Sequence, residues 1–395
     1  MLNQQEINYF EKVKTPFYFY DMGLLQKSLF AIKDAADLYN FHLHYAVKAN
    51  ANERILRTIK GFGLGADCVS GNEIQTALNN GFSPHQIVFA GVGKTDDEIE
   101  LAINSNIFSI NCESVQELEV INSIAKKLNK RVRIALRINP NVDALTHSKI
   151  TTGLKFNKFG ISLIDVKFII ENINSYENLF IEGLHFHIGS QITILDVYKK
   201  LCKVVNDTFS YFTSQGVRIK HINLGGGLGI NYQNPESQIP NFLSYFEIFK
   251  DNLNVPENVD LHFEPGRSIV GQCGYLISKI LYSKTEGNNN TLIIDAGFTE
   301  LLRPALYDAN HKIVNLSSRN KTEIYDIAGP ICETSDYFGR AIELPLSKRG
   351  DLIGIYSTGA YGEVMASQYN LRSLVSKYYS DEIPLLPIAG KFLFV

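Results

Sequence analysis

The stretch FHLHYAVKAN, residues 41–50, is the first of a series of short apolar segments that decides the fold. Each segment is nearly continuous in hydrophobicity and is followed by a turn and a helix-like stretch. Strands that are buried on both faces of a parallel sheet have this pattern. The eight segments are FHLHYAV (41–47), LGAD (64–67), QIVFA (86–90), IFSI (107–110), VRIALRI (132–138), FIEGLHF (180–186), KHINL (220–224) and DLHFE (260–264).

Signals for helix starts lie between these segments. A Ser or Thr followed three residues later by Glu offers a cap oxygen and a returning carboxylate. Such pairs occur at Ser70 and Glu73, at Thr95 and Glu98, and at Ser114 and Glu117. Eight strand–helix units predict an α/β fold with a (β/α)8 TIM-like barrel, a domain that usually takes about 250 residues. We place this barrel domain at residues 22–270.

The pattern changes after about residue 270. GYLISKILYS and TLIIDAGF flank the turn-rich residues 286–290 and predict a hairpin, and EIYDIAG and DLIGIYSTG indicate further strands. We therefore expect a mostly β C-terminal domain over residues 271–395. The early segment FYFYD (17–21) fits either domain, so a contribution of residues 1–21 to the second domain stays open.

Composition narrows the class of partner. The 395 residues suit two domains, and a net charge of −3 without a long Lys/Arg run gives no support for nucleic-acid or membrane binding. The N-terminal residues are polar and mixed in charge, which does not fit a secretory signal, and the apolar segments are strand-sized, which is too short for a transmembrane helix. Five cysteines are scattered without a C-x-x-C pair, which is typical of a reduced, cytoplasmic protein: Cys68, Cys112, Cys202, Cys273 and Cys332.

Polar and glycine residues gather at the predicted carboxyl ends of the barrel strands, where active sites of such barrels lie. They are Lys48, Asp67, Arg137, the run His187–Ser190, the run Gly225–Gly229 and the run Glu264–Arg267. A lysine that is desolvated at a strand end has a lowered pKa and can attack an aldehyde. A solvated lysine is the alternative for Lys48 on its own, and its surroundings favour the nucleophile.

The glycine run GGGLG offers backbone N–H groups and, followed by a helix, would form an anion cradle. Alone it is also compatible with a flexible turn, but Arg267 at the neighbouring strand end favours a phosphate site. Glu264 is suited to a protonated pyridine nitrogen or, alternatively, to a structural pair with Arg137 or Arg267. His185 and His187 alternate along one strand side. We expect no metal there because no third ligand is nearby, and we expect His185 to be a hydrogen-bonded core residue.

The second domain carries three further motifs. Arg303 and Tyr307 lie four apart in RPALY, on one face if that segment is helical, and could clamp a carboxylate or be ordinary surface residues. Cys332 and Glu333 follow Gly-Pro in a predicted loop, where the thiol could move a proton and the carboxylate bind an amine; a small buried cysteine is the alternative. Tyr361 lies between glycines in GAYG and is either a ligand contact or a turn residue.

Together these motifs resemble the fold-type III pyridoxal-phosphate (PLP) decarboxylases, and among them the diaminopimelate decarboxylases, over essentially the whole chain. The matching segments are HYAVKAN, GADCVSGNEI, HSKITTGLKFNKFGI (147–161), HFHIGSQ, GGG, EPGR, RPALYDANH, GPICETSD and GAYG. Thr334 is a mild departure, since the family usually has Ser there. Ornithine decarboxylases have Asp-Gly after the cysteine, where this chain has Glu333 and Thr334.

The resemblance implies the cofactor PLP and a role for each residue. Lys48 would form the Schiff base, with Asp67 near it; His187 would stack on the ring, Ser190 would bind phosphate, and Glu264 would take the ring nitrogen. The remaining cofactor contacts would be Arg137, Gly225, Gly226, Gly227, Gly266, Arg267 and Tyr361. Substrate would be held by Arg267, Arg303, Tyr307, Glu333 and Tyr361, and Cys332 would donate the proton.

The activity implied is decarboxylation of meso-2,6-diaminopimelate to L-lysine by a homodimer whose active sites lie at the subunit interface. Alternatives are decarboxylation of ornithine, arginine or carboxynorspermidine, an amino-acid racemase, and a PLP-carrying binding protein. Arg303 and Glu333 argue against ornithine. Arg303 is the cation that a second carboxylate needs, ornithine has no second carboxylate, and Glu333 is the anion that the distal amine needs. A racemase would require a tyrosine base where Cys332 stands.

Overall fold

The computed structural model describes residues 2–144, 158–236, 238–287 and 289–383. Residues 147–157 of the motif at 147–161 therefore lie outside the described residues. The chain divides into two compact units. We call Gln26–Asn231 with Ile239–Val270 the barrel unit, and Met1–Leu25, Tyr232–Gln238 and Gly271–Val395 the β unit.

The barrel unit contains the predicted closed parallel barrel, in which the eight strands follow one another in chain order. This confirms the (β/α)8 prediction. The first and last barrel strands pair with each other and place His42 opposite His262. The strands are β2 (His42–Ala46), β3 (Gly65–Cys68), β4 (Ile87–Phe89), β5 (Ser109–Cys112), β6 (Val132–Arg137), β7 (Leu179–His185), β8 (His221–Asn223) and β9 (Asp260–Phe263).

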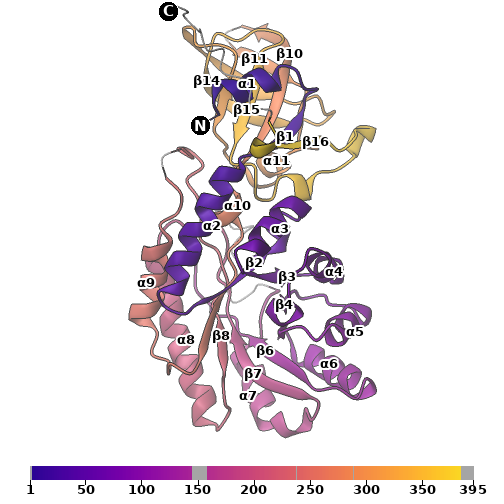
Figure 1. Ribbon diagram of the computed structural model, residues 1–395, viewed down its shortest axis with the longest axis vertical. Coiled ribbons are helices and arrows are strands. Elements are labelled where there is room, and N and C mark those ends of the chain that lie inside the picture. The colour runs from indigo at the N-terminus through magenta and orange to yellow at the C-terminus, as the bar shows by residue number, and fades with distance from the viewer. Residues whose placement is uncertain (1, 145–157, 237, 288, 384–395) are drawn as a thin grey trace, which may run out of the picture. The chain divides into compact units, whose positions relative to one another are not determined.

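Helices cover the outside of these strands (Figure 1). Their apolar residues face inward, as Ile55, Leu56 and Ile59 do in α3. The helices are α2 (Met22–Asp37), which begins in the β unit, α3 (Glu53–Gly61), α4 (Gly71–Asn79), α5 (Asp96–Asn104), α6 (Val115–Lys127), α7 (Leu163–Glu171), α8 (Asp196–Ser214), α9 (Phe242–Asn252) and the short α10 (Arg267–Val270). None of the helices in the described part of the chain has both the length and the apolar run needed to cross a bilayer.

The helix starts match the predicted caps in part. Thr95 and Glu98 form the reciprocal capping box at α5. At α4, Ser70 accepts the N–H of Glu73, but the Glu73 carboxylate accepts the N–H of Val69 instead of that of Ser70. The Glu117 carboxylate at α6 likewise accepts the N–H of Glu113. The reciprocal capping box predicted at α4 and α6 is therefore wrong, because each carboxylate accepts the N–H of the residue before the cap residue.

The β unit contains a sheet with the strand order β12-β15-β10-β11-β13-β14, to which β1 and β16 are added. β10 and β11 are antiparallel, so the predicted hairpin is confirmed. The segment left open at 17–21 contains β1, which pairs with β10 and β16. The strands are β1 (Phe17–Tyr20), β10 (Gly274–Glu286), β11 (Asn289–Ile294), β12 (Ile313–Asn315), β13 (Thr322–Ala328), β14 (Tyr337–Pro345), β15 (Leu352–Tyr356) and β16 (Ser376–Tyr379).

Two helices belong to the β unit as well, α1 (Gln4–Phe10) and the single turn α11 (Arg303–Tyr307). The core beneath α1 is aromatic and contains Phe10, Phe17, Phe19, Tyr275, Ile277, Leu352 and Tyr356. Edge-to-face contacts between Phe10 and its neighbours Phe17 and Phe19 hold α1 against β1.

Candidate active site

Lys48 and Asp67 form an ion pair at the carboxyl end of the barrel. Lys48 lies in the single 3-10 turn Val47–Ala49 that directly follows β2, and Asp67 lies on the adjacent β3. The Lys48 Nζ donates to Asp67 Oδ2 at 2.8 Å, and Asp67 is fully buried. Burial and the nearby charge of Glu264 raise the pKa of Asp67, and the charge of Lys48 offsets part of that effect. The lysine amine is thus held at the barrel rim by a carboxylate from the next strand.

Glu264 follows β9 and is held by three inward-facing polar side chains. Its Oε1 accepts from Asn223 at 2.7 Å and from Asn111 at 3.5 Å, and its Oε2 lies 3.2 Å from His185 Nε2. Burial alone would raise the pKa of Glu264, but attraction to His185 and Lys48 outweighs it and holds the pKa well below its ordinary value. The structure therefore offers an ionised carboxylate inside the barrel, and His185 is the core histidine that we expected.

His187 lies at the end of β7 against the glycine run. Its Nδ1 accepts the N–H of Gly226 at 3.3 Å. Loss of water around the ring, with the positive charges of Arg137 and Lys48, lowers the pKa of His187 to about 3. The ring is therefore neutral near pH 7, which leaves its flat face available to an aromatic ligand without charge repulsion.

The glycine run packs backbone against backbone. A Cβ on Gly226 would lie 2.0 Å from the carbonyl oxygen of Glu264, and one on Gly227 would lie 2.5 Å from that of Gly189. Gly227 also has a φ of +98°, which favours glycine. The chain after the run is irregular until α9 begins at Phe242, so the expectation that a helix directly follows is wrong. Any anion here would be held by backbone N–H groups and side chains instead of by a helix end.

Arg267 and Ser190 meet beside this run. Arg267 Nη2 donates to Ser190 Oγ at 3.1 Å, and the guanidinium is almost completely buried. Gly266 allows this turn to approach the Lys48 turn closely, since a Cβ there would lie 3.0 Å from the Cβ atoms of Ala46 and Ala49. A buried cation, a hydroxyl group and a glycine run are therefore gathered at the ends of β7, β8 and β9.

Arg137 has a different partner from the one considered in the sequence. It forms a buried ion pair of 2.5 Å with Glu113, and its guanidinium lies over the Phe159 ring at 4.6 Å. Glu113 also accepts the N–H of Gly160 at 2.9 Å. The structural pair of Glu264 with Arg137 is thus replaced by Glu113 with Arg137. Through the N–H of Gly160, this ion pair holds the segment that begins at residue 158 against the barrel.

Arg303 is buried in the β unit, so it is not an ordinary surface residue. It lies at the start of α11, one helical turn before the half-buried Tyr307. His311 Nδ1–H donates to the Tyr356 carbonyl at 2.8 Å, which leaves Nε2 to accept from Arg303 Nη1 at 2.8 Å. The guanidinium also lies over the Tyr232 ring at 4.7 Å. These contacts fix the direction of the arginine before any ligand binds.

Cys332 and Glu333 lie on an exposed loop of the β unit with a rigid base. Asp336 is buried and accepts the N–H groups of Phe298 and Ile331, both at 2.7 Å. Glu333 Oε1 accepts from the Tyr369 hydroxyl at 2.6 Å. The exposure of Cys332 excludes the alternative of a small buried hydrophobic residue. Tyr361, also in the β unit, is half-buried with a φ of +56°, a conformation that a bulky residue rarely adopts.

Comparisons with known proteins show the family of this chain. Residues 24–271 match the family model of the pyridoxal-dependent decarboxylases, in its pyridoxal binding domain. The chain is 50% identical to diaminopimelate decarboxylase of Bacteroides thetaiotaomicron, over 95% of this chain and 98% of that protein. It is 40% identical to the enzyme of Aquifex aeolicus, over 91% and 84% of the two chains. The chain belongs to the diaminopimelate decarboxylase family.

Solved structures of the family have the same fold. Diaminopimelate decarboxylase from Helicobacter pylori complexed with L-lysine matches with a TM-score of 0.87 at 38% identity, over 94% of this chain and 93% of that one. Diaminopimelate decarboxylase from m. jannaschii in co-complex with L-lysine matches with a TM-score of 0.87 at 37% identity, over 95% of this chain and 89% of that one.

The barrel residues of this family member fit pyridoxal phosphate. The cofactor presents an aldehyde, a pyridine nitrogen and a phosphate group, and the barrel rim offers an amine, an ionised carboxylate and an anion site. One observation tests the fit independently: Asp67 Oδ1 is buried and lacks a hydrogen-bond partner among the described residues. A buried carboxylate oxygen with no partner is costly, and a cationic group bound beside it would remove that cost.

Several residues that shape the site were missed in the sequence. Asn111 and Asn223 hold Glu264, and Glu113 holds Arg137. A polar residue inside or directly after a strand-sized apolar run was the available signal for Asn223 and Asn111. His311, Tyr232 and Asp336 position the β-unit residues. His311 and Asp336 lay inside motifs that we had singled out, and Tyr232 did not.

Proposed function

We propose that this chain decarboxylates meso-2,6-diaminopimelate to L-lysine and CO2, the last step of lysine biosynthesis, with PLP as cofactor. The observation that carries the proposal is the extent of the family match. It covers 95% of the chain, and so includes both Lys48 in the barrel unit and Arg303 and Glu333 in the β unit. The family match therefore includes the proposed substrate-binding residues as well as the proposed cofactor-binding residues.

PLP, when bound, supplies an electron sink that accepts the electron pair left behind when CO2 departs. Lys48 would hold the cofactor by its aldehyde, and Glu264 would keep a proton on the pyridine nitrogen. His187 would lie on the ring. Ser190, Arg267, Gly266 and the N–H groups of Gly225, Gly226 and Gly227 would bind phosphate. Asp67 would orient Lys48, and Arg137 and Tyr361 would complete the cofactor contacts.

The substrate carries two carboxylates and two amines, and the chain offers groups of both signs. Arg303, fixed by His311, and Tyr307 would bind the carboxylate that is retained, together with Arg267 and Tyr361. Glu333 would bind the distal ammonium, and its hydrogen bond from Tyr369 holds it in one direction. Protein groups of opposite charge at both ends of the substrate would orient the other α-carboxylate for loss as CO2.

Cys332 would return the proton to the carbon that loses CO2. A thiol can donate a proton and be restored from solvent, and Cys332 is exposed. Its place on a loop braced by Asp336 keeps the sulfur at a defined position. The carbon that loses CO2 becomes a CH2 group without a stereocentre, so the L configuration of lysine is that of the retained α-carbon, which keeps all its bonds.

We further propose a homodimer in which Cys332 and Glu333 come from one subunit and Lys48 from the other. The exposure of both loop residues in the single chain supports a role completed by a second copy. Symmetric dimers are the commonest assembly of soluble enzymes. The five cysteines, all free among the described residues, support a reducing compartment such as the cytoplasm.

The alternatives lack comparable support. A decarboxylase of ornithine, arginine or carboxynorspermidine would have no second carboxylate for Arg303 to bind. A racemase would need a second base in place of Cys332. A binding protein that carries PLP would hold the cofactor without turnover, and would not need a fixed Arg303.

Replacement of Lys48 by Ala tests the proposal. Lys48→Ala is expected to lose both the visible absorbance of lysine-bound cofactor and the release of CO2 from meso-diaminopimelate, because it removes the amine that is paired with Asp67 and would hold the cofactor. Lys33→Ala is the matched control, since Lys33 lies on the outer helix α2. Decarboxylation at the wild-type rate by Lys48→Ala would refute the assignment.

A further inference from the structure

A layer of imidazole rings lies inside the barrel, two residues before Glu264 along β9. Side chains alternate between the two faces of a strand, so Asp260 and His262 face the same side as Glu264. The His262 ring lies 5.1 Å from that of His44 and 5.6 Å from that of His221, measured between centroids. Glycines make room for this layer, since a Cβ on Gly183 would lie 2.1 Å from His221 Nε2. The proposed reaction uses none of these rings.

A chain of hydrogen bonds fixes which nitrogen of His262 carries its proton. The Gln86 carbonyl can only accept, so His44 Nδ1, at 3.0 Å, is the donor. A neutral imidazole that donates through Nδ1 accepts through Nε2, so His44 Nε2 accepts from His262 Nδ1–H at 2.8 Å. His262 Nε2 is then a bare lone pair. It is buried, and it lacks a hydrogen-bond partner among the described residues.

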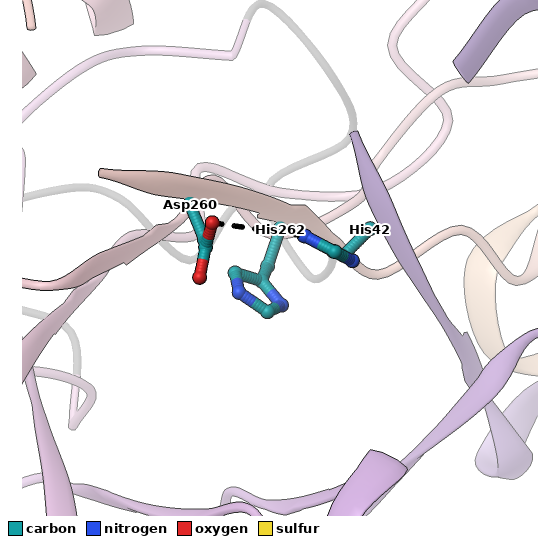
Figure 2. A group of neighbouring side chains, drawn as sticks. All are labelled: His42, Asp260 and His262. Carbon is teal, nitrogen blue, oxygen red and sulfur yellow. Dashed lines mark ion pairs between the residues drawn. The ribbon is translucent and has the colours of Figure 1, made fainter. Parts of the chain in front are cut away.

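His42 and Asp260 place two further ligand atoms near a ring nitrogen of His262. His42 and Asp260 are the first residues of β2 and β9, the strands that pair where the barrel closes. His42 Nε2 lies 3.9 Å from Asp260 Oδ1, and one ligand atom from each of the three residues lies within 4.8 Å of the others. Figure 2 shows Asp260 and His262 on β9 and His42 on the adjacent β2.

We propose that His42, Asp260 and His262 bind one divalent transition-metal ion of the zinc class. Two imidazoles and a carboxylate are a ligand set that zinc accepts, with water in the fourth position. His44 would act as the outer partner that orients His262, as hydrogen-bond acceptors do for metal-bound histidines. This inference departs from our expectation of no metal, which rested on His185, His187 and the scattered cysteines.

The separations are compatible with binding after small side-chain movements. Ligand atoms around one zinc ion lie about 3.3 Å apart when the bonds are about 2.0–2.1 Å long. The side chains of His42 and Asp260 are 46% and 58% exposed, so both can rotate toward the fixed His262. The ion would join the first and last barrel strands at the amino end of the barrel. Lys48 and Glu264 lie at the carboxyl ends of the same two strands, so the site is separate from the chemistry.

Zinc binding to the PLP-loaded, full-length protein tests the inference. The protein is dialysed against zinc chloride in a chelator-free buffer, and bound zinc per chain is measured together with the midpoint of urea unfolding. The variants are His42→Ala and Asp260→Asn, whose side chains are exposed and whose loss leaves the barrel core intact. His85→Ala is the matched control, because His85 is exposed and supplies no ligand atom.

We expect the wild type and His85→Ala to bind one zinc ion per chain. His42→Ala and Asp260→Asn should bind zinc at least about tenfold more weakly. Zinc should raise the unfolding midpoint of the first two proteins and leave that of the other two unchanged. Zinc affinity that is equal in all four proteins would assign the ion to another site, such as the Cys332 thiol, and would overturn the inference. Absence of zinc binding by the wild type would overturn it as well.

Discussion

At the scale of single residues, the charged groups at the barrel rim are held by partners from other strands. Lys48, Asp67 and Glu264 could be selected because each directly follows or ends an apolar strand. Asn223 reaches Glu264 from the neighbouring β8, and Asn111 reaches it from β5. Sequence spacing carries no information about such contacts, because they depend on the register and closure of the whole barrel.

Glu264 gives the sharpest prediction at this scale. Glu264→Gln keeps the size of the side chain and removes the negative charge that would hold a proton on the pyridine nitrogen. We expect kcat for meso-diaminopimelate to fall by about 10²–10³, the range for loss of one electrostatic contact in an active site, while PLP stays bound. Steady-state kinetics and cofactor absorbance measure the two effects. Glu53→Gln on the exposed face of α3 is the control, and wild-type kcat in Glu264→Gln would contradict the assigned role.

At the scale of elements, periodicity and cap residues predicted the strands and helices closely. The eight runs correspond to β2–β9, with ends that differ by one or two residues. The details that failed depend on neighbours outside the element. Glu73 and Glu117 reach an N–H at the end of the preceding strand, and no helix follows the glycine run directly. Local sequence patterns predict each helix or strand, and residues outside it decide the hydrogen bonds at its ends.

The glycine run provides a test of close packing. Gly226→Ala would place a methyl group 2.0 Å from the Glu264 carbonyl oxygen. We expect it to lower the free energy of unfolding by about 1–3 kcal/mol, the usual cost of overpacking, and to weaken PLP binding. Urea unfolding and cofactor titration are the measurements. Gly61→Ala at the end of α3 has open space around it and should leave both quantities unchanged, so equal effects of the two substitutions would exclude this packing argument.

Two helix-cap glutamates should respond to pH with opposite sign. Burial raises the pKa of Glu73 to about 7, so between pH 4.5 and 7 the folded protein keeps a proton that the unfolded chain releases. Stability due to this group therefore falls as pH rises through that range, by up to about 1.4 kcal/mol per pH unit. Glu73→Gln should gain free energy of unfolding relative to the wild type between pH 5 and pH 8.

Glu98 is the matched case for that experiment. Hydrogen bonds from the N–H groups of Thr95 and Gly71 lower the pKa of Glu98, so its contribution is present above pH 4.5 and is lost as pH falls below that value. Glu98→Gln should therefore be less stable than the wild type at pH 7, with the difference shrinking on acidification. Urea unfolding over a pH series measures both variants, and the same sign for Glu73→Gln and Glu98→Gln would refute the account.

At the scale of the whole molecule, the β unit contains two pieces that precede residue 271 in the chain. Met1–Leu25 joins it through β1, and Tyr232–Gln238 joins it from within the barrel sequence. Tyr232 places its ring against Arg303. A contribution of residues 1–21 was left open from the sequence, and Tyr232–Gln238 was missed, because the contacts that recruit each piece are with residues far away in the chain.

Shared active sites between two subunits can be tested by complementation. Lys48→Ala and Cys332→Ser should each be inactive alone. If one subunit supplies Lys48 and the other Cys332, random mixing gives mixed dimers with one intact site, and about a quarter of wild-type activity returns. Coexpression of the two variants with separate affinity tags measures this. Mixed dimers without any recovered activity would show that each chain completes its own site.

Substrate selection by Arg303 and Glu333 is the central claim, and CO2 release from meso-diaminopimelate, ornithine and arginine in parallel tests it most directly. We expect kcat/KM for meso-diaminopimelate to exceed that for the other two by at least about a hundredfold, since a site with a buried Arg303 rejects a substrate that lacks the second carboxylate. L-lysine should be the product. Comparable turnover of ornithine, or no CO2 from meso-diaminopimelate, would contradict the account.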